Sequence, residues 1–270
     1  MRSDLRRLGP VALAAVIAIT LVPAATASDH DTSATAMHAA EREAFRLTNQ
    51  RRAARGLVNL RLDSRLTELA RERANYMADT GRFSHTQANG TDVFDMIQTA
   101  GIRWYAAGEI IAWNTAGPLD YSAEFAVKGW MGSPSHKAIV VSDDYNYVGF
   151  GLAIAGDGTR YWAGVYLRGP DRNGGYVRMG GFSTEPISSR IVRGTVSWMG
   201  RDLLLQVLTA GHRDFQVQWR RVGYAWNNLG TTTARRLTKW WRRGWTYEVR
   251  VRERDRKGNL GRWVVKTLKP

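Results

Sequence analysis

The sequence predicts an α+β domain followed by a small all-β sandwich, and three observations support this division. Helical periodicity dominates residues 39–140, and a β-hairpin pattern follows it. After a glycine-rich stretch the apolar period changes to two, as in half-buried strands. The charge changes at the same point: residues 28–184 carry 17 basic and 17 acidic side chains, whereas residues 185–270 carry 19 basic and 6 acidic ones.

Residues 1–27 are predicted to be a signal peptide that directs secretion. A segment with three arginines precedes an apolar run over residues 11–22, and the small residues at 25–27 are typical of a cleavage site. The run is too short to span a bilayer comfortably, and no other stretch of the sequence predicts a transmembrane segment. Polar residues 28–38 predict a flexible leader.

The chain has no cysteine. A secreted protein without disulfides depends on core packing for its stability, which is typical of exported bacterial proteins. The absence of cysteine also excludes thiol catalysis and cysteine-ligated zinc.

Four helices are predicted in the first domain. The first covers residues 39–55 and ends before a glycine. Asp63 caps the second, and Gly81 is its expected C-terminal glycine. Thr91 is expected to cap a short third helix, and the fourth covers residues 122–132 before a Ser-Pro pair.

Strands follow the helices. Residues 147–155 and 160–167 form a hairpin, because an Asp-Gly pair lies in the turn between them. Residues 110–113 predict a further strand. Glycine-rich residues 169–186 are interpreted as a linker, and alternating apolar residues over 187–270 predict a small β-sandwich.

Two histidines and one carboxylate form the constellation that predicts a site. His85, Glu109 and His136 each lie in a short, turn-rich context, in a chain with five histidines. They are spread over about 50 residues of sequence, so only tertiary folding brings them together.

A series of ordered motifs accompanies these residues over 39–168. They are Leu47-Thr48-Asn49-Gln50-Arg51-Arg52, Leu66 to Ala70, His85, Ala100-Gly101-Ile102, Gly108-Glu109, Gly129-Trp130-Met131 with Ser133-Pro134 and His136, and Val148-Gly149 with Gly151. This series resembles the CAP superfamily (cysteine-rich secretory, antigen 5 and pathogenesis-related proteins) in its bacterial, cysteine-free form. The resemblance implies an α-β-α sandwich with a surface cleft.

In that family two histidines and acidic residues line the cleft, and by resemblance they correspond to His85, Glu109 and His136. The fourth, acidic position is open between Asp92 and Asp95. Two imidazoles and a carboxylate suit zinc or a similar divalent metal with an open position for water. The alternative is a hydrogen-bonded network that ties the loops to the helices.

The sequence departs from the family pattern at three polar positions. Ile110 and Ile139 stand where asparagine is common, and Met96 stands where arginine is usual. Losing one partner of a buried polar network costs about 1–3 kcal/mol per stranded group, so joint loss is better tolerated. We therefore expect apolar packing to replace the polar network around the cleft, which weakens an enzymatic interpretation.

Aromatic residues near the three motifs have two interpretations. They are Trp104, Tyr105, Trp113, Trp130 and Trp162. Most such residues pack in the core or at its rim. The alternative is a hydrophobic groove for a lipid or peptide, as the family resemblance allows.

Residues 187–270 resemble a fibronectin type III domain, most closely over residues 244–259. The resemblance implies that Tyr247 lies at a strand corner with its hydroxyl bonded to nearby backbone. We expect Trp198, Trp219 and Trp263 to lie in the core.

Most arginines of the second domain fall at outward positions. They include Arg220, Arg221, Arg235, Arg236, Arg242, Arg243, Arg250, Arg252 and Arg254, with Lys239 beside them. They form either a solvated face or an adhesion surface for anionic cell-wall polymer or membrane. Export disfavours nucleic acid as the partner.

The sequence therefore favours a secreted binding or interaction protein, possessing a His/Glu cleft and a basic domain for attachment at the cell envelope. The alternative is a metal-dependent, peptidase-like hydrolase that uses His85, Glu109 and His136. The binding role is preferred because the CAP resemblance carries no general reaction.

Overall fold

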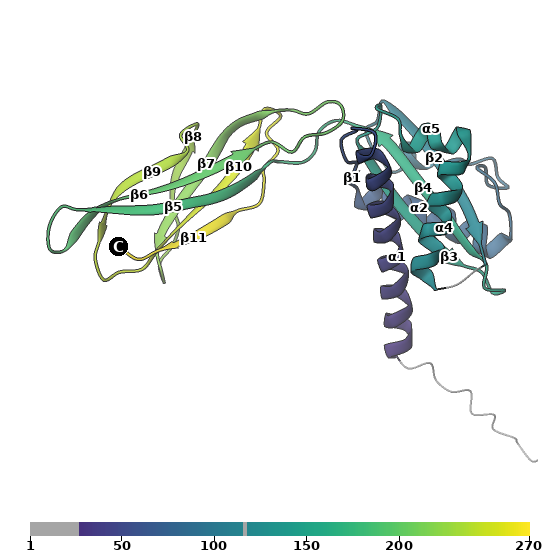
Figure 1. Ribbon diagram of the computed structural model, residues 1–270, viewed down its shortest axis with the longest axis horizontal. Helices are drawn as coiled ribbons and strands as arrows, with labels where there is room; N and C mark the ends of the chain where they lie inside the picture. The colour runs from purple at the N-terminus through teal and green to yellow at the C-terminus, as the bar shows by residue number, and fades with distance from the viewer. Residues whose placement is uncertain (1–26, 116–117) are drawn as a thin grey trace, which may run out of the picture.

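The computed structural model describes residues 27–115 and 118–270, so the predicted signal peptide lies almost entirely outside the described residues. The chain forms two bodies at opposite ends of a long molecule, joined by the segment after β4 (Arg160–Arg168) (Figure 1). No helix among the described residues has both the length and the apolar character needed to cross a bilayer.

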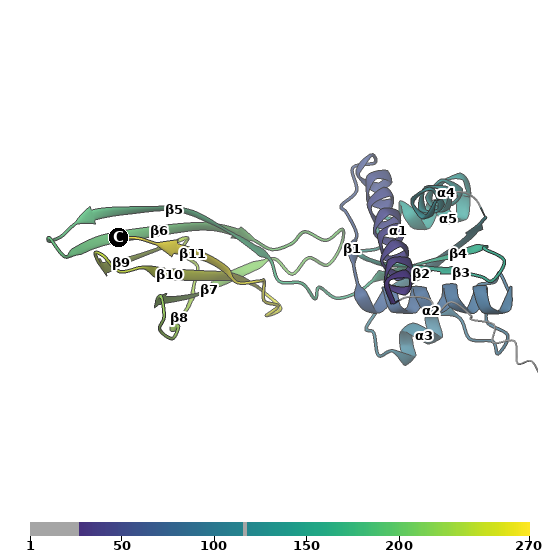
Figure 2. The ribbon, with the colours of Figure 1, turned by 90° about the horizontal axis from the view of Figure 1, so that it is seen from below.

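The first body is a three-layer α-β-α arrangement. Its elements are α1 (Ala27–Ala53), β1 (Arg61–Leu62), α2 (Ser64–Thr80), α3 (Val93–Thr99), β2 (Ala106–Asn114), α4 (Leu119–Gly132), α5 (Pro134–Val140), β3 (Tyr147–Ile154) and β4. The sheet has the order β1-β3-β4-β2, in which only β1 pairs in parallel. Helices α2 and α3 cover one face, and α1, α4 and α5 cover the other (Figure 2).

Two glycines of β3 explain why helix and sheet approach so closely. A Cβ atom at Gly149 would lie 2.1 Å from the backbone of Leu66, and one at Gly151 would lie 2.2 Å from the backbone of Ala70. Because backbone cannot move aside as a flexible side chain can, β3 packs directly on α2 only with glycine at both positions. This contact fixes the position of α2, which supplies part of the candidate site.

The helix boundaries confirm two predicted caps and correct a third. Asp63 accepts hydrogen bonds from the first turn of α2, and Gly81 ends that helix in the left-handed conformation with φ of 66°. The predicted cap Thr91 is wrong. Asp92, one residue after Thr91, caps α3, because its carboxylate accepts from the N–H groups of Phe94 and Asp95. The Asp95 carboxylate accepts from the Asp92 N–H in return, which completes a capping box.

The flexible leader predicted over residues 28–38 is also corrected. Helix α1 begins at Ala27 and runs without interruption to Ala53. The segment contains neither glycine nor proline and is rich in alanine, so nothing in it stops the helix from extending beyond its packed part.

The second body contains seven strands in two sheets. They are β5 (Tyr176–Pro186), β6 (Ile191–Arg201), β7 (His212–Arg221), β8 (Asn227–Thr232), β9 (Arg236–Arg242), β10 (Tyr247–Asp255) and β11 (Val264–Leu268). One sheet has the order β11-β10-β7-β8 and the other β5-β6-β9. The linker predicted over 169–186 is therefore wrong beyond residue 175, because β5 pairs along most of its length with β6.

One apolar cluster fills the space between these two sheets. Trp198, Val249 and Val251 are buried in it, and Trp219 packs against it. The Tyr247 hydroxyl accepts a hydrogen bond from the Arg242 backbone N–H at 3.3 Å, as the resemblance implied. Trp263 is not in this core: the guanidinium groups of two β10 arginines lie over its ring instead.

A loop of the second body docks into the first. We define residues 202–211, between β6 and β7, as the docking loop. Leu205 is only 2 % exposed and belongs to the apolar cluster under α2. The Gln206 side-chain oxygen accepts from the Val58 N–H at 2.7 Å, and Arg61 donates to the Leu204 carbonyl at 3.1 Å. The two bodies therefore share buried apolar surface and hydrogen bonds.

Replacing Leu205 with alanine should lower the free energy of unfolding by about 2–5 kcal/mol, because a buried leucine leaves a cavity. Leu204, the preceding residue, is the matched control, since its own side chain is 60 % exposed. Leu204→Ala should change stability by less than about 0.5 kcal/mol. Urea unfolding measures both, and equal effects would contradict the docking role of Leu205.

Candidate functional site

The candidate site is built around a buried carboxylate. Glu109 lies on β2 and is 7 % exposed, and Arg73 on α2 is fully buried beside it. The Arg73 Nε donates to Glu109 Oε1 at 2.7 Å. A second guanidinium nitrogen of Arg73 donates to the Ser84 carbonyl at 2.6 Å. The arginine therefore balances the charge of Glu109 and also holds the backbone beside His85.

His85 completes this cluster from the loop that follows α2. Its Nδ1 lies 2.7 Å from Glu109 Oε2, while 54 % of its side chain is exposed. Because an ionised carboxylate can only accept, Nδ1 carries the proton in this contact. The other ring nitrogen, Nε2, takes no part in this contact. The structure thus brings His85 and Glu109 together.

His136 is the third predicted site residue, and it lies near His85. It lies in α5 and is partly exposed. Burial lowers the pKa of His136, and the nearby charge of His85 lowers this pKa further. At neutral pH His136 is therefore an uncharged imidazole. The two histidines are close enough to interact electrostatically, although they come from segments about 50 residues apart.

Arg73 is the site residue that the sequence interpretation missed. It lies on the buried face of α2 with Leu66, Leu69, Ala70, Ala74 and Met77. A lone arginine at helical spacing among apolar residues was the available signal. A buried arginine at such a position requires a buried acidic partner.

Both candidates for the fourth, acidic position take part in the cap of α3. Asp92 Oδ1 accepts from the backbone N–H groups of Phe94 and Asp95, at 2.8 and 3.0 Å. Asp95 Oδ2 accepts from the Asp92 N–H at 3.2 Å. These hydrogen bonds give both aspartates a role in starting α3.

Apolar packing occupies the three positions where the sequence departs from the family pattern. Ile110 is fully buried, and Ile139 packs against the same cluster between the sheet, α1 and α4. Met96 is buried in the cluster on the opposite face. This confirms the prediction that packing replaces polar side chains there.

The aromatic residues near the site divide into buried and exposed groups. Trp130 and Trp162 are fully buried, and their indole N–H groups donate to the Ile111 carbonyl and the Ser122 hydroxyl. Trp104, Tyr105 and Trp113 are exposed, and Trp104 stacks on Phe94. The core interpretation is therefore confirmed for the first two.

The side chains at this site do not fit a three-ligand zinc centre. Both oxygens of Glu109 are engaged, one by Arg73 and the other by His85. The Nδ1 atom of His85 is engaged in the same contact. A cation would also lie beside the buried positive charge of Arg73, which disfavours it. Each histidine can offer one further ring nitrogen, so these side chains supply two ligands instead of three, and we derive no metal chemistry here.

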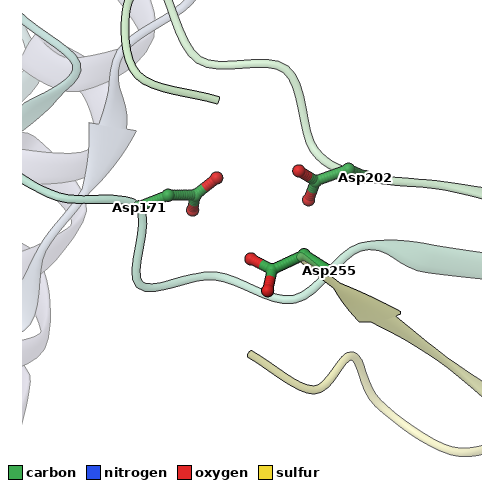
Figure 3. Close-up of side chains that lie close together, drawn as sticks. All are labelled: Asp171, Asp202 and Asp255. Atoms are coloured by element: carbon green, nitrogen blue, oxygen red, sulfur yellow. The ribbon is translucent and has the colours of Figure 1, made fainter. Parts of the chain in front are cut away.

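Three aspartates gather at a second place, where the two bodies join (Figure 3). Three side chains are buried together here: Asp171, Asp202 and Asp255. Within the described ranges they are the one group of three or more histidine or acidic side chains whose ligand atoms all lie within 4.8 Å of one another. Each of their six oxygens already accepts a hydrogen bond, mostly from backbone N–H groups.

These hydrogen bonds organise the docking loop. Asp171 accepts from the Ala210 N–H at 2.9 Å, and Asp202 accepts from the Gly211 N–H at 2.6 Å. Burial raises the pKa of the Asp202 carboxyl, and the charges of Asp171 and Asp255 act in the same direction. The cluster therefore holds the loop to the connection between the bodies.

Comparison with known proteins shows which protein family the first body matches. Residues 45–166 match the sequence profile of the Cysteine-rich secretory protein family, CAP. This part of the chain is therefore a CAP domain, and it contains no cysteine. The profile covers the three motifs of the candidate site and ends before the second body.

Two curated relatives come from Bacillus subtilis (strain 168). The chain is 32 % identical to "Uncharacterized protein YkwD" over 135 residues, which are 49 % of this chain and 51 % of that protein. It is 30 % identical to "Uncharacterized membrane protein YlbC" over 113 residues, 42 % of this chain and 31 % of that protein. The chain thus spans about half or less of each relative.

Two solved structures are also similar. An extracellular protein containing a SCP domain from Bacillus anthracis str. Ames is 24 % identical, with a TM-score of 0.42 over 49 % of this chain and 41 % of that one. An outer surface protein from Borrelia burgdorferi is 21 % identical, with a TM-score of 0.42 over 46 % of this chain and 89 % of that one.

Replacing Arg73 with leucine should lower the free energy of unfolding by about 3–5 kcal/mol, because the Glu109 carboxylate loses its permanent counter-charge. The matched control is Arg65→Leu on the same helix, whose guanidinium is exposed and 3.7 Å from Asp63. That change should cost less than about 1 kcal/mol. If urea unfolding gives equal small losses, Arg73 does not hold the site.

The His136 imidazole should titrate below the ordinary histidine value of 6.5, as followed by NMR. Between the lowered pKa and 6.5 the native state binds fewer protons than the unfolded chain, so acidification through this window reduces stability. His85→Gln removes a like charge and should raise the His136 pKa partway. His38→Gln on α1 is the control, and an equal shift there would refute the coupling.

Proposed function

We propose that this protein is a secreted binding or interaction protein of the cell envelope. The CAP domain presents the His85–Glu109 pair, with His136 near it, to a ligand, and the second body attaches the protein to an anionic surface. The observation that carries the proposal is the charge division, since residues 185–270 have 13 more basic than acidic side chains. Such a domain attracts polyanions.

The second body is proposed to be a fibronectin type III-like sandwich. The order of its strands in a three-stranded and a four-stranded sheet supports this proposal. The hydroxyl of Tyr247, bonded to nearby backbone, is a second supporting feature. A sandwich of this kind offers broad, flat sheet faces, which suit adhesion better than catalysis.

A binding role also suits the chemistry of the CAP cleft. Glu109 is paired to Arg73 and is therefore a poor general base, because its charge is already stabilised. The hydrolase alternative needs this carboxylate free for a metal or a proton. What remains accessible is the outward edge of His85 and one uncharged imidazole at His136, which suit hydrogen bonding to a ligand.

A lipid or a peptide is the proposed ligand class for the CAP domain. Support comes from exposed aromatic side chains on its surface. Tyr121 and Phe125 are four residues apart on α4, so they are neighbours on one helix face, and both are at least half exposed. Trp113, at the end of β2, is 56 % exposed. Such rings contact acyl chains and apolar peptide side chains well.

The attachment proposal predicts salt-sensitive binding to bacterial cell walls. The full chain from residue 28 should sediment with walls at about 0.1 M salt and be released near 1 M, where screening acts over only about 3 Å. Walls stripped of phosphate-linked polymer are the control and should bind less. Binding that persists at high salt would contradict an electrostatic attachment.

A further inference from the structure

The outer face of the four-stranded sheet carries an alternating stack of arginine and tryptophan side chains. We define the ladder as Arg220, Trp226, Arg250, Trp263 and Arg252. The guanidinium groups of Arg220 and Arg250 lie over the Trp226 ring, at 4.4 and 4.1 Å from its centroid. Those of Arg250 and Arg252 lie over Trp263 at 4.6 and 4.4 Å.

Hydrogen bonds across the sheet fix the guanidinium groups in place. Arg250 is paired in register with Gln218, and its Nε donates to the Gln218 amide oxygen at 2.8 Å. Arg252 makes the same contact with Gln216, also at 2.8 Å. Stacking and hydrogen bonding together remove much of the rotamer freedom that an arginine would lose on binding.

The ladder has an excess of positive charge. Arg220 pairs with Glu248 at 2.6 Å. In the part of the chain that the structure describes, no carboxylate lies within ion-pair distance of Arg250 or Arg252, whose partners are the neutral glutamines. Burial lowers the pKa of Arg250, and the charges of Arg220 and Arg252 act in the same direction. A bound anion would relieve this crowding of like charges.

We propose that the ladder is a binding site for a linear polymer that bears repeated phosphate groups, which gives the proposed attachment function a defined surface and ligand class. Guanidinium forks match phosphate oxygens and bind them with two parallel hydrogen bonds. Arg250 and Arg252 are two residues apart on one face of β10, so their positions repeat at about 7 Å along the strand. Such a row suits consecutive charges of one extended chain.

The ladder disfavours a membrane as the partner. Trp226 and Trp263 are only partly exposed, and guanidinium groups cover their rings. Insertion into a bilayer needs apolar side chains that protrude from the surface. The covered rings serve instead to hold the arginines apart and in line.

The test measures binding of the full chain from residue 28 to long-chain inorganic polyphosphate by calorimetry. Arg250→Gln with Arg252→Gln should weaken binding roughly tenfold, since charge-assisted hydrogen bonds are lost. It should also reduce the slope of log affinity against log salt by about 1 to 2 units, one for each lost phosphate contact. The matched control, Arg236→Gln with Arg243→Gln, removes the same charge from exposed positions outside the ladder and should lose less than about threefold.

A second double variant keeps the proposal testable if the double glutamine variant misfolds. Arg250→Lys with Arg252→Lys retains the charge and loses the planar fork, so it should bind several-fold more weakly with an unchanged circular dichroism spectrum. Wild-type affinity in this variant would overturn the ladder. Equal losses in the ladder and control pairs would also overturn it while leaving general electrostatic attachment intact.

Competing ligands distinguish the chemistry. Polyglutamate of matched charge should bind more weakly than polyphosphate, and equal binding would refute the phosphate preference. Binding to phosphatidylglycerol vesicles that polyphosphate cannot displace would identify a membrane surface instead. If the unaltered chain binds neither polyphosphate nor cell walls, the attachment function itself fails. That outcome differs from the failure of the ladder alone.

Discussion

The CAP domain depends on one electrostatic constraint: a carboxylate buried beside the sheet needs a counter-charge that water cannot supply. Arg73 meets this need for Glu109, and the same guanidinium holds the Ser84 carbonyl. Helix, strand and loop therefore meet at one ion pair. Removing either partner would strand a buried charge, which is why the pair constrains the geometry around His85 so strongly.

The same constraint limits the chemistry of the candidate site. A glutamate whose charge is already balanced orients an imidazole well and serves poorly as a metal ligand or general base. Ile110, which is buried, and Ile139, which packs against the same apolar cluster, stand where the family commonly has asparagine, so neither gives the site a polar group. The site therefore leaves two histidine side chains for contact with a ligand, as the proposed binding function requires.

Charge is handled differently in the second body. Buried aspartates at the junction accept hydrogen bonds, mostly from backbone N–H groups, and two of these bonds hold the docking loop. The arginines of β10 are instead kept at the surface, stacked on indole rings and bonded to neutral glutamines. The CAP domain thus pairs the charge of Glu109 in its interior, whereas the second body keeps these arginines at its surface.

Local patterns in the sequence by themselves determined the helix that Asp63 caps and Gly81 ends, the β3–β4 hairpin, the change to strand periodicity and the uneven charge. The tertiary structure alone decided the partner of Glu109, the strand that replaces most of the expected linker, and the position of Trp263 outside the core. The reason is physical. Caps, turns and periodicity act between residues close in sequence, whereas Arg73 and Glu109 are 36 residues apart and meet only through packing. The sequence therefore does not predict which residue pairs with a buried arginine or which groups stack on a tryptophan, because these contacts exist only once the sheets have formed.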